Sequence, residues 1–456
     1  MSALAELFTG QDAQPATKRL DAGLDAIDLR PVVGRVSKVS GTIVEAKLTG
    51  ARLGEMCALR VSSGDNPDER LAEVVGFREG TALLSVLGEM VGISQSTVVT
   101  KTGVPLMAPI GNSLLGRVID GLGAPLDTAT KGPLYPEGRR IAMTPPPDAL
   151  SRASISEALP LGIPAFDAFN TVGQGQRVGL FGDAGVGKST LMSAIAKAAS
   201  ADVAVIALVG ERGREVSEFI EDSLGPEGMA KSVIVAATSD RPAMERLKAP
   251  FVATAIAEGF RDQGLRVVLL MDSLTRLARA QREIGLAAGE PPARRAFPPS
   301  VFALLPQLIE RAGVSPDGGS ITAFYTVLME DGGVGDPIAE EARSLLDGHI
   351  ILSRKIAEAG KFPAIDVLAS RSRVMSRVAP RSLVDASEHL RALMARYGEI
   401  ELLLRMGEYQ RGSDALADEA ILKKDVIDKW IHHDLSNPVT WKETTESLPK
   451  FASAKP

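Results

Sequence analysis

The sequence has very little cysteine, few aromatic residues and no excess of positive charge. It contains a single cysteine, Cys57, so no disulfide can form within the chain, which fits a reducing compartment. Aromatic residues make up only 4% of the chain, so its cores must be built mainly from leucine, valine, isoleucine and alanine. Lysine and arginine number 51 against 57 acidic residues, a net charge of −6. Proteins that wrap nucleic acid usually carry a basic excess, so we expect no nucleic-acid partner.

Long apolar runs are also missing. The unbroken runs at residues 203–209 and 267–271 are far too short to span a bilayer. The first ten residues do not combine a basic segment with a long apolar stretch, so we expect no secretory signal and a cytoplasmic protein. The 456 residues are 45% hydrophobic and 24% charged, which is the composition of a globular protein and the length of more than one domain.

The first 103 residues contain two different patterns. Residues 1–29 have apolar residues at mixed helical spacing, interrupted at 9–17, and fit either a short helical arm or a frayed terminus. Residues 30–103 contain short β-branched runs between turn residues, which is typical of a small β-barrel domain. The clearest of these runs are 34–39, 41–46, 71–75 and 81–86.

From residue 104 to 380, strand-like and helical segments alternate, which predicts a parallel sheet covered by helices. The strand-like runs are 177–181, 203–209, 267–272, 320–327 and 349–353, and a helix is predicted over 189–199. The segment 128–147 is rich in proline and glycine and is expected to be a loop. In residues 381–456 the strand signals stop, and the segments 383–407 and 413–433 have the leucine and isoleucine spacing of helices, so a C-terminal helical domain is expected.

The segment Gly-Asp-Ala-Gly-Val-Gly-Lys-Ser at 182–189 matches the phosphate-binding P-loop pattern. Glycines allow the backbone conformations in which successive N–H groups point at phosphate oxygens, and the following helix adds the positive end of its dipole. The lysine supplies charge to the phosphates, and the serine hydroxyl is a ligand for Mg²⁺. The residues predicted to bind ATP here are Gly182, Asp183, Ala184, Gly185, Val186, Gly187, Lys188, Ser189 and Thr190.

Acidic residues follow two of the predicted strands. Asp272 ends an unbroken apolar run, which predicts a strand buried on both faces with a carboxylate at its ligand-binding end. We therefore expect Asp272 and Ser189 to hold Mg²⁺. Glu211 and Arg212 end the strand that begins at residue 203, and Glu211 is the candidate for activating the attacking water. A surface ion pair is the alternative for this Glu–Arg pair.

Further segments resemble the nucleotide-binding α and β subunits of rotary ATPases and ATP synthases, over nearly the whole chain from about residue 32. The segment Pro-Ala-Ile-Asp-Val-Leu-Ala-Ser-Arg-Ser at 363–372 resembles that family's signature, and 115–127, 162–167 and 172–177 resemble its approaches to the core and the P-loop. Segments 291–303 and 407–414 are most similar to the flagellar and type III secretion export ATPases, of which the flagellar kind is favoured. The resemblance implies an α/β fold with a RecA-like P-loop core, an N-terminal β-barrel domain and a C-terminal helical domain.

The resemblance also implies roles for individual residues. Glu211 corresponds to the family's catalytic glutamate, Arg212 to the arginine beside it, and Arg276 to a further arginine that contacts phosphate. Arg373 corresponds to an arginine finger that reaches into the neighbouring subunit's site, although a solvated basic face is the alternative because Arg371 and Arg377 are close in sequence. Phe362 takes the place of the aromatic residue that packs on adenine.

The same resemblance implies partners. A shared site implies a ring, most simply a homohexamer, in which the segment 291–302 faces the centre and binds a central stalk protein; a plain connection is the alternative. The arm at 1–29 would bind a regulatory stalk protein. Export substrates and their chaperones would be the cargo, and the ring would associate peripherally with a membrane export gate, at the inner face of the cytoplasmic membrane.

Three rival functions remain open at this point. One is a catalytic β-type subunit of an ATP synthase, which would need a second homologous chain. Another is a nucleotide-binding structural subunit without turnover, against which Glu211 argues. The third is an RNA-translocating hexamer, which the acidic balance makes weak.

Overall fold

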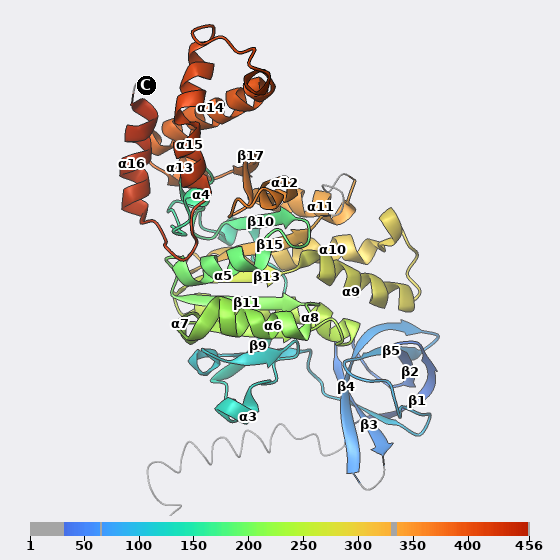
Figure 1. Cartoon of the computed structure of the whole chain (residues 1–456). Coiled ribbons are helices and arrows are strands. Elements are labelled where there is room, and N and C mark those ends of the chain that lie inside the picture. The colour runs from blue at the N-terminus through green and yellow to red at the C-terminus, as the bar shows by residue number, and fades with distance from the viewer. Residues whose placement is uncertain (1–31, 64–65, 330–334, 455–456) are drawn as a thin grey trace, which may run out of the picture. The chain divides into compact units, whose positions relative to one another are not determined.

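The computed structural model describes residues 32–63, 66–329 and 335–454 of the chain. The arm predicted over residues 1–29 therefore lies outside the described residues. The remainder divides into two compact units, and the second comprises Leu87–Glu89 and the chain from Pro105 onward. Figure 1 shows both units and the labels used below. No helix among the described residues has the length and apolar character needed to cross a bilayer.

The first unit is a closed antiparallel barrel with strand order β1-β2-β5-β4-β3-β6. Its strands are β1 (Val33–Ser40), β2 (Ile43–Lys47), β3 (Met56–Ser63), β4 (Asn66–Arg78), β5 (Thr81–Val86) and β6 (Val98–Lys101). Because side chains alternate along each strand, Val44, Leu59 and Leu84 point inward and are completely buried. Cys57 lies in the same core, where burial raises the pKa of its thiol to about 11. The cysteine is therefore a structural apolar residue rather than a reactive one.

The second unit is built on a mixed sheet with the order β17-β16-β10-β15-β13-β11-β12-β8, and β14 pairs with β15. The described strands of this sheet are β8 (Val118–Asp120), β10 (Arg177–Gly182), β11 (Val203–Val209), β12 (Ser232–Ala237), β13 (Arg266–Asp272), β14 (Gly313–Val314), β15 (Ser320–Leu328), β16 (Gly348–Leu352) and β17 (Ile365–Ser372). The strands from β16 to β8 pair in parallel, whereas β17 runs antiparallel to β16. The carboxyl ends of the parallel strands therefore share one edge, where ligands bind in such sheets.

Helices bury both faces of this sheet. The helices around it are α4 (Pro164–Asp167), α5 (Lys188–Ala198), α6 (Gly213–Glu218), the π-helix η3 (Phe219–Leu224), α7 (Gly225–Ala230), α8 (Ala243–Arg261), α9 (Leu274–Ala287), α10 (Pro299–Ile309), α11 (Pro337–Leu345), α12 (Arg354–Glu358) and α13 (Met375–Val378). Ala204, Ile206 and Leu208 pack in one cluster with α5 and α7. The alternate residues of β11 point to the opposite face, and α8 packs against β11, β12 and β13.

Three helices complete the chain: α14 (Arg381–Met406), α15 (Ala415–Ile431) and α16 (Trp441–Ser453). They pack on one another, and α14 also contacts β17 (Figure 1, red). Leu390, Ile427 and Leu448 are buried in the cluster that continues from the sheet face. The predicted fold class, an α/β P-loop core with a β-barrel and a helical C-terminal part, is confirmed by this architecture.

Two expectations about loops were wrong in part. The segment 128–147 contains the short helix α3 (Thr128–Lys131) and the strand β9 (Gly138–Ile141), which pairs with β7 (Met107–Ile110). A four-residue strand flanked by prolines has too short an apolar pattern to be seen in the sequence. The segment 291–302 contains the short 3₁₀ helix η4 (Arg294–Ala296), and α10 begins within it at Pro299, where a proline is tolerated at a helix start.

Candidate active site

The P-loop joins β10 to α5 at the carboxyl edge of the sheet. Gly185 and Gly187 have φ angles of 80° and 88°, a region that favours glycine and turns the loop before the helix begins at Lys188. The Lys188 ammonium is almost buried and donates to the carbonyl oxygens of Gly182, at 2.9 Å, and Asp183. The loop thus holds the lysine beside the first turn of α5, whose N–H groups have no partner within the helix.

Asp272 is at the end of β13, next to both β11 and β15. Its carboxylate is buried, and one oxygen accepts a 2.6 Å hydrogen bond from the Thr326 hydroxyl. Burial raises the pKa of this carboxyl, while Thr326, Lys188 and Arg276 oppose the rise. A buried carboxylate is costly to keep charged without positive partners, and Lys188 and Arg276 are the charged groups that favour its ionised form here.

Glu211 follows β11 and faces α9. Arg276, in the first turn of α9, donates from Nε to Glu211 Oε1 at 3.0 Å and from Nη2 to Oε2 at 3.3 Å. Gly210 makes this approach possible, since it has φ 70° and a Cβ there would lie 2.7 Å from Arg276 Cδ. The Ser273 hydroxyl caps α9 by accepting from the Arg276 N–H at 3.3 Å and fixes where the helix begins.

Like Asp272, two further charged groups in this pocket, Glu211 and Lys188, have pKa values shifted in the direction that favours the neutral form. Burial, the nearby Asp272 carboxylate and Glu215 raise the pKa of Glu211 to about 7, against the effect of Arg276. Burial lowers the pKa of Lys188, although Asp272 opposes the change. The pKa of Glu211 therefore lies where a carboxyl can exchange a proton near neutral pH, which is the property of a general base.

The pocket at this edge has a volume of about 480 Å³. It brings together most of the residues that the sequence predicted for phosphate, metal and water: Ala184, Gly185, Gly187, Lys188, Ser189, Thr190, Glu211, Arg212, Asp272 and Arg276. The P-loop residues Gly182, Asp183 and Val186 do not line it. Arg212 is largely exposed, and its guanidinium lies 3.7 Å from Glu215. Ser189 and Asp272 supply a hydroxyl and a carboxylate, which are hard oxygen ligands of the type that Mg²⁺ prefers.

An apolar pocket of about 270 Å³ adjoins the P-loop. Val186, Gly187 and Thr190 line it on one side, and Phe362 and Pro363 line it on the other. A Cβ added at Gly187 would lie 3.7 Å from the Phe362 ring. A planar, apolar base fits such a pocket beside a phosphate loop.

Arg373 does not lie in either pocket. It follows β17, which runs antiparallel to β16, so it lies near the start of β16 and β10, at the amino edge of the sheet. Its side chain is exposed, and its Nη2 is 3.4 Å from the Arg343 carbonyl oxygen. Within one chain, this arginine and the P-loop are at opposite edges of the same sheet.

Sequence reasoning missed Thr326, Glu215 and Gly210. Thr326 lies next to Asp272 only because β15 and β13 are neighbours, so no local signal marks it. Gly210 had a signal, since a glycine between a buried strand and a charged pair indicates a close approach of another side chain.

These features together define a P-loop nucleotide-binding protein. Family models match residues 36–103 as the ATP synthase alpha/beta family β-barrel domain, 162–372 as that family's nucleotide-binding domain, and 379–450 as the type III secretion system EscN ATPase C-terminal domain. The chain belongs to the ATP synthase alpha/beta family, and within it to the branch of the type III secretion and flagellar export ATPases. The resemblance found in the sequence is thereby confirmed, as is the expectation of an ATPase.

Individual relatives show how much of the chain is shared. A type 3 secretion system ATPase from Xanthomonas euvesicatoria is 53% identical over 91% of this chain and 93% of its own length. A flagellum-specific ATP synthase from Bacillus subtilis is 46% identical over 91% of this chain and 94% of its own. The structure of the assembled ATPase EscN in complex with its central stalk EscO, from enteropathogenic E. coli, has a TM-score of 0.84 and 45% identity, covering 92% of this chain and all of that one.

Proposed function

We propose that the chain is the ring ATPase of a type III protein export apparatus, that it hydrolyses Mg-ATP, and that it uses the energy to dock, release and unfold export substrates. One observation carries the proposal. The P-loop, Asp272, Glu211 and Arg276 share one pocket, whereas Arg373 lies at the opposite edge of the sheet. The P-loop pocket and Arg373 are too far apart to act together within one chain. This arrangement suits a homo-oligomer, in which the Arg373 of each subunit completes the site of its neighbour.

The residues of the pocket fit a magnesium ion that is shared with a nucleotide. The described residues contain no group of three acidic, histidine or cysteine side chains that could hold a metal alone. Ser189 and Asp272 would therefore hold Mg²⁺ together with phosphate oxygens, and the ion would neutralise charge on those oxygens. The P-loop N–H groups and Lys188 would bind the phosphates, and Phe362 would pack on adenine.

Water activation falls to Glu211. With its pKa raised to about 7, its carboxylate is a base strong enough to accept a proton from water at neutral pH. Arg276 fixes the orientation of that carboxylate through two hydrogen bonds, and Arg212 is free to turn toward the phosphates because it is largely exposed. Arg373 of the adjacent subunit would stabilise the charge of the transition state, an effect worth about 10³-fold or more in rate.

One of the proposed partners, a central stalk protein, is supported by a relative. EscN was solved with a central stalk, and we propose that a stalk protein binds the segment 291–302 in the centre of a homohexamer. A regulatory stalk protein at residues 1–29, and peripheral attachment to an export gate at the cytoplasmic face of the membrane, complete the proposal. Named relatives include both flagellar and type 3 secretion ATPases, so loss of motility or loss of effector secretion after gene deletion decides between the two systems.

The test is the specific ATPase activity at increasing protein concentration, for the native chain and for Arg373→Ala. We expect the native activity to rise steeply with concentration as rings form. Arg373→Ala should remain low at every concentration while it binds a fluorescent ATP analogue normally. Arg377→Ala, which removes an exposed arginine four positions away, is the matched control and should behave like the native chain. Activity that is independent of concentration and of Arg373 would contradict a site shared between subunits.

A further inference from the structure

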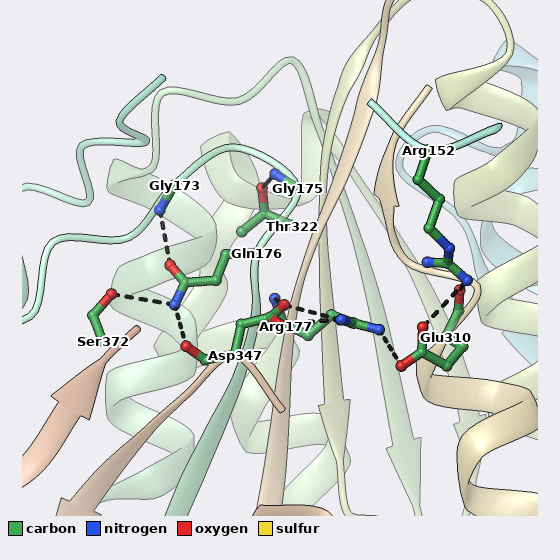
Figure 2. A network of polar contacts seen from close by, with 9 residues as sticks. All are labelled: Arg152, Gly173, Gly175, Gln176, Arg177, Glu310, Thr322, Asp347 and Ser372. Carbon is green, nitrogen blue, oxygen red and sulfur yellow. Dashed lines mark hydrogen bonds and ion pairs between the residues drawn. The ribbon is translucent and has the colours of Figure 1, made fainter. Parts of the chain in front are cut away.

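A polar network binds the segment that carries Arg373 to the start of β10 (Figure 2). Its centre is Asp347, whose carboxylate accepts from Arg177 Nε at 2.9 Å and Arg177 Nη2 at 3.1 Å. The Asp347 N–H donates to the Arg177 carbonyl, and the Asp347 carbonyl accepts from the Arg373 N–H, both at 2.9 Å. Asp347 thus joins the start of β10, the strand that leads to the P-loop, to the backbone of Arg373.

Gln176 strengthens this junction from a completely buried position. Its Nε2 donates to the Asp347 carbonyl at 3.1 Å and to the Ser372 hydroxyl oxygen at 3.2 Å, while its Oε1 accepts from the Gly173 N–H at 2.9 Å. The Ser372 hydroxyl donates in turn to the Thr171 carbonyl at 2.8 Å. Hydrogen bonds therefore hold both residues of the Ser372–Arg373 peptide, and the loss of the buried Gln176 amide would leave some of these polar groups without a partner, which is costly.

The guanidinium of Arg373 has much weaker support. Its side chain is exposed, and within the described part of the chain it makes one long hydrogen bond, to the Arg343 carbonyl. The direction in which this side chain leaves the surface is therefore set by its backbone. A group that stabilises charge in a transition state must be placed to within about 1 Å, and a misplacement of that size can cost on the order of 10²-fold in rate.

We infer that Gln176 and Ser372 are positioning residues for the arginine that acts in the adjacent subunit. The inference rests on the proposed role of Arg373. Neither residue lines the P-loop pocket of its own chain, so neither touches the nucleotide bound there. Their effect on hydrolysis is exerted through the Arg373 backbone and is felt in the neighbouring site.

Mixed rings separate this role from a general structural one. A Lys188→Ala chain has a defective P-loop but a normal Arg373, so it can supply its arginine to a neighbour whose own P-loop is intact. With random 1:1 assembly, an intact P-loop meets a normal arginine at about one quarter of the sites. We expect Gln176→Met to lose about 10- to 100-fold in kcat with nucleotide affinity within about twofold of native, and to recover activity when mixed with Lys188→Ala.

Three further variants make the outcome decisive. Ser372→Ala changes a half-buried position, so it should lose less activity than Gln176→Met and should also recover activity when mixed with Lys188→Ala. If Gln176→Met does not fold, Ser372→Ala alone tests the positioning role. Thr322→Val is the matched control: Thr322 is buried in the same region and accepts from Gly175 N–H at 2.8 Å, but it does not contact the Ser372–Arg373 segment. It should need no rescue. Arg373→Ala mixed with Lys188→Ala gives the reference level of recovery.

The results distinguish the two proposals. If Arg373→Ala is rescued by Lys188→Ala but Gln176→Met and Ser372→Ala are not, or if these variants lose nucleotide affinity, the positioning role is wrong and the shared site stands. If Arg373→Ala itself is not rescued, the shared site proposed above is wrong, and the positioning role fails with it.

Discussion

The two edges of the core sheet use the same kinds of residue in opposite ways. At the carboxyl edge, Asp272 and Lys188 are buried and Glu211 is half-buried, and the pKa of each shifts in the direction that favours its neutral form. At the amino edge, Arg177 lies between Asp347 and Glu310, and these partners raise the pKa of its guanidinium. Charges that lack full partners mark the place where a charged ligand binds, whereas fully paired charges support the fold.

The largest effect expected at the carboxyl edge comes from Glu211→Gln. Removing the base should reduce kcat by about 10²- to 10⁴-fold, because glutamine cannot accept the proton of the attacking water. Nucleotide binding should be retained, which equilibrium titration with a fluorescent ATP analogue would show. Glu218→Gln, on the exposed side of α6, is the control and should keep native kcat. A Glu211→Gln enzyme with more than a tenth of native activity would remove Glu211 from the mechanism.

This edge was also the part of the molecule that the sequence described best. The P-loop is a contiguous pattern, and Asp272 and Glu211 each follow an apolar run, so local signals predicted their placement at strand ends. Contacts between neighbouring strands join residues that are far apart in the sequence, and this is why the contacts of Thr326 and Gln176 could not be predicted. Thr326 contacts Asp272 across 54 residues, and Gln176 contacts Ser372 across 196. The roles of Arg276, Arg373 and Phe362 came from resemblance to a family, since nothing in their spacing distinguishes them from surface or core residues.

At the amino edge the largest expected effect is on stability. Arg311 is completely buried and donates to Glu258 through Nε at 2.8 Å and Nη2 at 2.7 Å. Arg311→Met leaves the Glu258 carboxylate buried without its main partner, so urea unfolding should show a loss of about 3–5 kcal/mol. Replacing Glu258 by methionine as well should restore much of that loss.

An exposed pair provides the control for this measurement. Arg381 and Asp385 are 2.9 Å apart on α14, with side-chain exposures of 80% and 55%. Arg381→Ala should change stability by less than about 0.5 kcal/mol, because solvent screens such pairs. If Arg311→Met were no more harmful than Arg381→Ala, the amino edge would not depend on paired charges as described.

The smallest expected effect concerns pH. The folded chain raises the pKa of Glu211 from 4.5 to about 7, so it binds this proton more tightly than the unfolded chain does. This group's contribution to stability is therefore present in full below pH 4.5 and is lost as pH rises through about 7. Glu211→Gln should then be more stable than the native chain at pH 8, by on the order of 1–3 kcal/mol, with the difference vanishing toward pH 4. Urea midpoints across this range measure it, and an unchanged difference at all pH values would contradict the raised pKa.

The antiparallel course of β17 has a mechanical consequence. Its first residue lies just after Phe362, beside the P-loop, and its last immediately precedes Arg373 at the far edge. β10 spans the same distance two strands away, from the Gln176 junction to the P-loop. If Arg373 acts as proposed, these two strands connect each nucleotide site in series with the next one around the ring. A displacement at one nucleotide would then be passed along these strands to the arginine that acts at the next nucleotide.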